Sequence, residues 1–85
     1  MGQTAGMGFQ VHAVVQMTTK PSDALVATLA DHFEEARYVP GSKVVSIIEH
    51  VSVAEERDAI EFVRSLVLDA VPQGSKITEI RAESD

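Results

Sequence analysis

The chain has 85 residues, a length that accommodates one hydrophobic core. Its 13 acidic and 7 basic residues give a formal net charge of −6, and the basic residues are scattered, which argues against nucleic-acid binding. There is no cysteine for a disulfide or a thiolate site, and no apolar run reaches membrane-spanning length, so we expect a cytoplasmic protein that does not bind membranes.

Residues 9–17 alternate in polarity, the pattern of a strand with one buried face. One side carries Phe9, Val11, Ala13, Val15 and Met17, and the other carries Gln10, His12, Val14 and Gln16. The residues before this strand lack the basic start and apolar stretch of a signal peptide. We therefore expect residues 1–7 to be a disordered lead-in and residues 8–85 to form a single α+β domain.

Residues 22–37 change to a helical period, with Ser22 as the expected N-cap. The predicted apolar stripe consists of Leu25, Val26, Leu29, Phe33 and Ala36. Residues 43–53 are β-branched and strand-like, and residues 75–82 form a final predicted strand. Between them, residues 53–71 are helical, with Ser52 and Glu55 spaced as a capping box.

The expected order is β-α-β-α-β, with two helices packed on one face of a three- or four-stranded sheet. An alternative stays open for the segment Arg37-Tyr38-Val39, which could form a short extra strand before the Pro40-Gly41 turn. The order would then be β-α-β-β-α-β, which is the ferredoxin-like arrangement.

One sheet face is expected to be of mixed polarity and to lie away from the helices. A sheet covered on both faces would have near-continuous apolar strands, whereas these strands alternate. The candidate binding residues on this face are His12, Val14, Gln16, Val44, Ile48 and His50. A surface with an apolar centre and a polar surround is typical of a protein–protein interface. An exposed Leu68 on the second helix is a weaker marker of the same kind.

No residue pattern indicates catalysis, a metal or a cofactor. His12, His32 and His50 lack the short spacing of zinc ligands, so we expect no metal site. Glu49 is the exception among the carboxylates, because its register points it toward the core, where an ionised carboxylate needs a partner. A strand-end position, a bulge, or pairing with Arg37 or Lys43 would explain it. An anion site at Thr18-Thr19-Lys20 is less favoured than ordinary turn chemistry.

Three features together resemble short uncharacterised proteins of actinobacteria and their phages. These are Phe9-x-Val11, the helix end Ala70-Val71-Pro72 and the final strand Ile77-x-x-Ile80. The resemblance implies no enzyme activity, and a phage member would often act by binding a host protein.

The sequence therefore predicts a non-enzymatic protein-interaction module. It would self-associate, with a homodimer favoured, or bind a protein partner through the mixed sheet face. The alternatives are a small-ligand-sensing regulatory domain with its site at a subunit seam, and a small enzyme that uses His12, His50 and Glu49 at an interface.

Overall fold

Four strands and two helices make up residues 8–84, the part of the chain that the computed structural model describes. The elements in chain order are β1 (Phe9–Gln16), α1 (Asp23–His32), β2 (Glu35–Tyr38), β3 (Val44–Val51), α2 (Glu56–Ala70) and β4 (Lys76–Ser84). The order is thus β-α-β-β-α-β, and the extra strand left open by the sequence is present as β2. The predicted lead-in at residues 1–7 lies outside the described residues.

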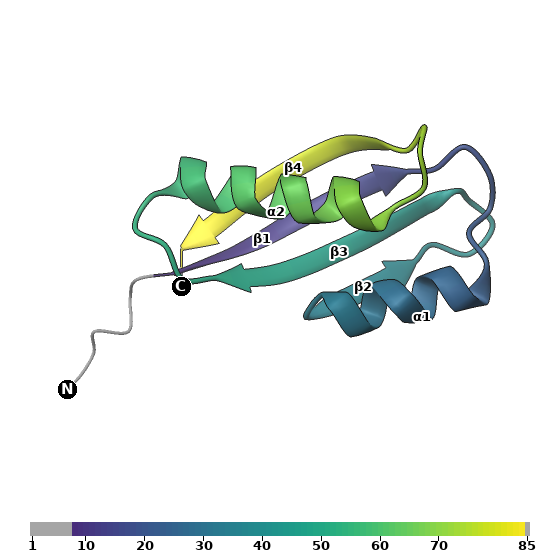
Figure 1. Ribbon diagram of the computed structural model, residues 1–85, viewed down its shortest axis with the longest axis horizontal. Helices are drawn as coiled ribbons and strands as arrows, with labels where there is room; N and C mark the ends of the chain where they lie inside the picture. The colour runs from purple at the N-terminus through teal and green to yellow at the C-terminus, as the bar shows by residue number, and fades with distance from the viewer. Residues whose placement is uncertain (1–7, 85) are drawn as a thin grey trace.

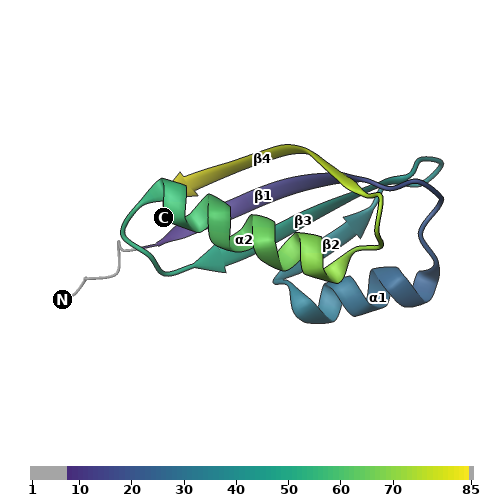
Figure 2. The same ribbon diagram turned by 45° about the horizontal axis from the view of Figure 1, so that its top comes forward.

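The strands form one antiparallel sheet in the order β2-β3-β1-β4. β1 is central and pairs with β3 on one side and with β4 on the other. Both helices lie on the same side of this sheet, α2 across the long strands and α1 beside β2 (Figures 1 and 2). This α+β architecture, with two helices on one face, confirms the predicted fold class.

The first helix is shorter than predicted, because it ends at His32 and not near residue 37. Phe33 is already extended, with φ −118° and ψ 162°, and its amide donates the last helical hydrogen bond to the Leu29 carbonyl. Ala36, predicted on the helix stripe, instead pairs with Ile47 across β2 and β3. Strand pairing has overridden the helical period, which is a weak local preference.

The second helix begins at Glu56, later than the predicted capping box. Glu55 is the N-cap residue and its side chain makes no capping hydrogen bond, so the Ser52–Glu55 prediction is wrong. β3 continues to Val51, and residues 52–55 carry the chain from the sheet to the helix layer, with Val53 packed against the core. Ser22, in contrast, caps α1 as predicted, since its hydroxyl accepts a hydrogen bond from the Leu25 amide at 3.1 Å.

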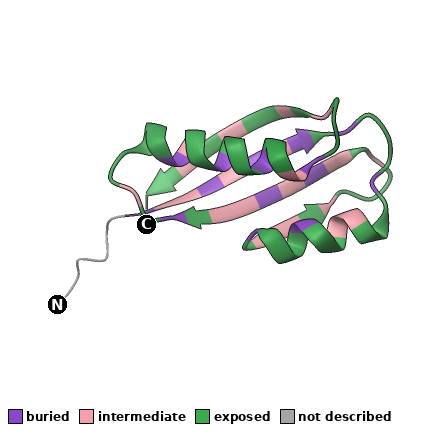
Figure 3. Ribbon diagram, viewed as in Figure 1, coloured by how far each residue is buried: buried purple, intermediate pink, exposed green. Residues whose placement is uncertain are grey.

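The core lies between the sheet and the helices, mainly beneath α2 (Figure 3). α2 supplies Ala59, Val63 and Val67, each four residues from the next and each fully buried. α1 buries only Leu29 within its length. The other fully buried large side chains come from β1 and β3, namely Val11, Val15, Val45 and Ile47.

Candidate interaction face

The sheet face opposite the helices is defined by strand register and is called the open face below. On β1 the buried residues Val11, Ala13 and Val15 point to the helices, so the residues between them point away. Register partners share a face, which extends the open face to the neighbouring strands. Its residues are Glu35 and Arg37 on β2, Val44, Ser46, Ile48 and His50 on β3, Gln10, His12, Val14 and Gln16 on β1, and Lys76, Glu79, Arg81 and Glu83 on β4.

All six candidate binding residues from the sequence lie on the open face. The pairings that join them are His12 with Ile48 and Gln16 with Val44, while Val14 is paired with Ser46 and His50 with Gln10. His12, Val14, Val44 and Ile48 are half-buried, whereas Gln16 and His50 are exposed. The structure thus brings the six onto two central strands.

Sequence reasoning missed the edges of the open face. The helical period predicts Glu35 within the first helix and leaves Arg37 either at the end of that helix or in the possible extra strand, and the candidate face includes no residue of the final strand. Two rows now cross the whole sheet: Glu35–Ile48–His12–Arg81 and Arg37–Ser46–Val14–Glu79. The alternation of charged Glu35 and Arg37 with Ala36 and Tyr38 was the available signal for a strand.

Charges on the open face are confined to its two edge strands and are balanced. Glu35, Glu79 and Glu83 are matched in number by Arg37, Lys76 and Arg81. Arg37 Nε lies 2.6 Å from Glu35 Oε2, and Arg81 Nη2 lies 3.9 Å from Glu83 Oε2. The open face is therefore neutral, although the whole chain carries −6.

The two helices carry much of the chain's excess of acidic over basic residues. They contain Asp23, Asp31, Glu56, Asp58, Glu61 and Asp69 against Arg57 and Arg64. Like charges on two such helix layers would repel one another, whereas the open face carries no net charge.

One polar atom on the open face is shielded from solvent. His12 Nε2 is buried and has no hydrogen-bond partner among the described residues. Such atoms are uncommon in folded proteins. Because solvent does not reach this nitrogen, it does not mark a contact point on the surface of the open face.

Glu49 belongs to the other face of β3, and its partner is neither of those predicted. Its Oε1 accepts a hydrogen bond from the backbone amide of Glu34 at 2.7 Å. Arg37 pairs with Glu35 instead. Glu49 therefore holds the connection between α1 and β2 against β3, a structural role that explains a carboxylate on the helix side of the sheet.

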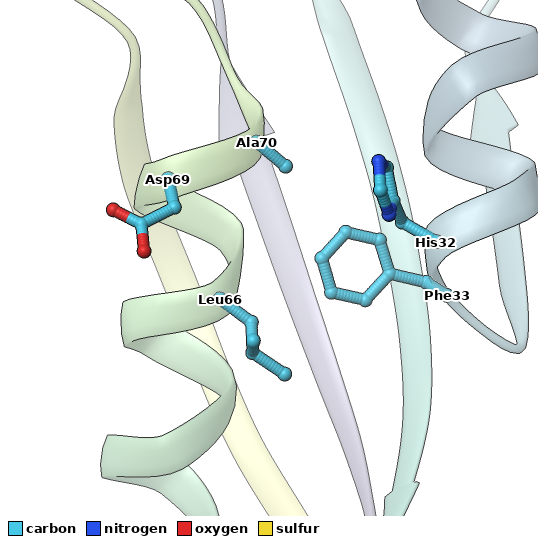
Figure 4. A pocket seen from close by; sticks show the side chains of 5 residues that line it. All are labelled: His32, Phe33, Leu66, Asp69 and Ala70. Carbon is cyan, nitrogen blue, oxygen red and sulfur yellow. The ribbon is translucent and has the colours of Figure 1, made fainter.

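A cavity of about 210 Å³ lies between the two helices, on the side of the sheet away from the open face (Figure 4). Phe33, Leu66 and Ala70 supply apolar surface, and His32 and Asp69 stand on opposite walls. Pockets for metabolites usually occupy about 300–1,000 Å³, so this cavity is small for one.

A second hollow, of about 260 Å³, is lined by Thr18, Thr19 and Lys20 together with the start of α1. The Ser22 hydroxyl at this helix start is already occupied by the Leu25 amide. Nothing in the geometry goes beyond the turn chemistry that the sequence favoured.

His12 and His50 lie on the open face and Glu49 on the opposite one, so the cluster required by the interface-enzyme hypothesis does not form. Within residues 8–84, no group of three or more metal-ligating side chains is arranged to hold an ion. Neither helix of this part of the chain is long and apolar enough to cross a membrane.

Comparison with known proteins finds no matching family model, no curated relative and no solved structure. The resemblance to actinobacterial and phage proteins therefore stays a prediction.

Proposed function

We propose that this protein is a non-enzymatic interaction module that self-associates through its open sheet face. The observation that carries the proposal is the composition of that face: Val14, Val44 and Ile48 are half-buried on its two central strands, and charged side chains stand only on its edge strands. An apolar centre within a polar rim is the anatomy of protein interfaces.

A further observation supports self-association. The neutral open face allows two copies to approach while their acidic helices point outward. A cytoplasmic setting remains part of the proposal as a prediction from the sequence.

The small-ligand alternative receives less support. The cavity between the helices is on the far side of the sheet from the proposed seam, and its volume is small for a metabolite. The cavity therefore does not lie at the proposed interface, where the small-ligand alternative would need it.

The test is the solution mass across protein concentration, measured by light scattering or sedimentation. We expect the wild-type chain to dimerise reversibly and the Ile48→Glu variant to be a folded monomer at the same concentrations, because a carboxylate at this apolar position would lose its hydration in the interface. Leu68→Glu is the matched control: Leu68 is 50 % exposed on α2, away from the open face, so this variant should still dimerise.

A wild-type chain that stays monomeric up to millimolar concentration would overturn the proposal. So would a dimer that Ile48→Glu leaves intact. Circular dichroism of each variant checks that the fold is retained.

A further inference from the structure

From the positions of the charges and apolar residues, we infer how two copies pair. The partner is a second copy related by a two-fold axis that runs parallel to the strands and passes between β1 and β3. This inference rests on the proposed function, because it uses the same open face. The axis places β1 over the partner's β3 and β2 over the partner's β4.

The apolar centre fits itself in this arrangement. Val14 pairs with Ser46 within the chain, so the axis brings Val14 opposite the partner's Ser46, a small side chain. On the same face of the partner's β3, that serine is flanked by the partner's Val44 and the partner's Ile48. Val14 therefore enters a gap between two apolar side chains. The two-fold axis creates the same contact a second time, between the partner's Val14 and β3 of the first copy. Side chains of packed sheets interdigitate in this way.

The charged edges also match. Glu35 and Arg81 are the two ends of one row, and Arg37 and Glu79 are the two ends of the next. Because the axis exchanges the edges, Glu35 faces the partner's Arg81, and Arg37 faces the partner's Glu79. Each row therefore carries opposite charges at its ends, which makes the face complementary to its own copy.

A two-fold axis that crosses the strands is the rival arrangement. It would pair Glu35 with the partner's Arg37, which is also favourable. However, Val14 would then lie opposite the partner's His12, and the residues beside that histidine on the same strand face are the partner's Gln10 and the partner's Val14. The apolar match therefore selects the axis parallel to the strands.

The size of the face sets the expected strength. The three long strands have eight or nine residues and β2 has four, so at about 3.4 Å per residue and 4.8 Å between strands the projected area is about 470 Å² per copy. The total of about 950 Å² is in the range of weak, transient interfaces. We therefore expect a dimer that dissociates on dilution and is sensitive to its rim charges.

Two exchange variants test the pairing without changing composition or net charge. The first variant carries Glu35→Arg and Arg37→Glu on β2. The ion pair between positions 35 and 37 is preserved, with its two charges exchanged. The second carries Glu79→Arg with Arg81→Glu on β4. In a dimer of either variant alone, like charges meet at both edges, and we expect the dissociation constant to rise at least about tenfold, equivalent to about 1.4 kcal/mol.

An equimolar mixture of the two variants should recover wild-type affinity as a heterodimer, because opposite charges then meet at both edges. The fourfold variant, with both exchanges in one chain, should recover it as a homodimer. It also controls for the altered contact between position 81 and Glu83.

Unchanged dimerisation of each exchange variant alone would overturn this arrangement in favour of the axis that crosses the strands. Loss of affinity that neither the mixture nor the fourfold variant restores would overturn it too. In both cases the wild-type chain still dimerises, so these outcomes differ from a monomeric wild-type chain, which would overturn the proposed function itself.

Discussion

The two faces of the sheet are made by the same strands but differ in how far they are buried. Ile47 and Ile48 are chemically identical neighbours on β3, yet Ile47 is fully buried under the helices and Ile48 is half-buried on the open face. The two-residue period of a strand separates them. One face of each strand therefore builds the core of the monomer, while the other carries the proposed interface, and substitutions on the two faces should have separate effects.

The largest expected effect is on the helix-side face. Ile47→Ala should lower the free energy of unfolding by about 2–5 kcal/mol, because it removes buried methyl groups and leaves a cavity. Chemical denaturation measures the loss. If this variant does not fold, Ile47→Val should still show a loss of about 0.5–1.5 kcal/mol. A cost below these ranges would contradict the assignment of Ile47 to the core.

Glu49 tests the polar exception on that same face. Glu49→Ala should cost about 1 kcal/mol of stability, since the Glu34 amide loses a charge-assisted hydrogen bond in a partly exposed setting. Glu49→Gln retains an acceptor oxygen and should cost less. Equal losses for the two variants, measured by thermal unfolding, would show that the contact with the amide is not what matters.

The helix that covers β2 offers a third test. Ser22→Ala should lower stability by about 0.5–1 kcal/mol by removing the N-cap of α1. Thr28→Ala is the matched control on the same helix, because the Thr28 hydroxyl bonds back to the Ala24 carbonyl and this bond adds little to helix stability. Amide hydrogen exchange of α1 should speed up in the first variant only.

The smallest effect on the monomer is expected at the open face. Ile48→Ala should change the free energy of unfolding by less than about 1 kcal/mol when measured in dilute monomer, because this side chain is only half-buried. The same substitution should weaken dimerisation measurably. A loss of monomer stability as large as that of Ile47→Ala would remove the distinction between the two faces.

The accuracy of the sequence-based predictions depended on how local each signal was. The alternation in β1 identified the central residues of the open face, because a two-residue period assigns side chains to faces without reference to the rest of the chain. The Ser22 cap was equally local and is present. The end of α1 was missed because residues 33–38 satisfy a helical period and a strand period at once.

The capping box failed for a related reason. Ser52 and Glu55 have the right spacing, but four residues are needed to bring the chain from β3 to the helix layer, and α2 starts only at Glu56. The partner of Glu49 was missed because the predicted partners were side chains, and the structure uses the backbone amide of Glu34.

The sequence by itself determined the element types, the α+β class and the two central strands of the open face, since hydrophobic periods and turn residues act over a few positions. Only the tertiary structure decided the strand order, the presence of β2 and the rows that link Glu35 to Arg81 and Arg37 to Glu79. Those features depend on which strands pair and in which register. Pairing joins residues far apart in the chain, and no local pattern encodes the charge balance that it creates across the sheet.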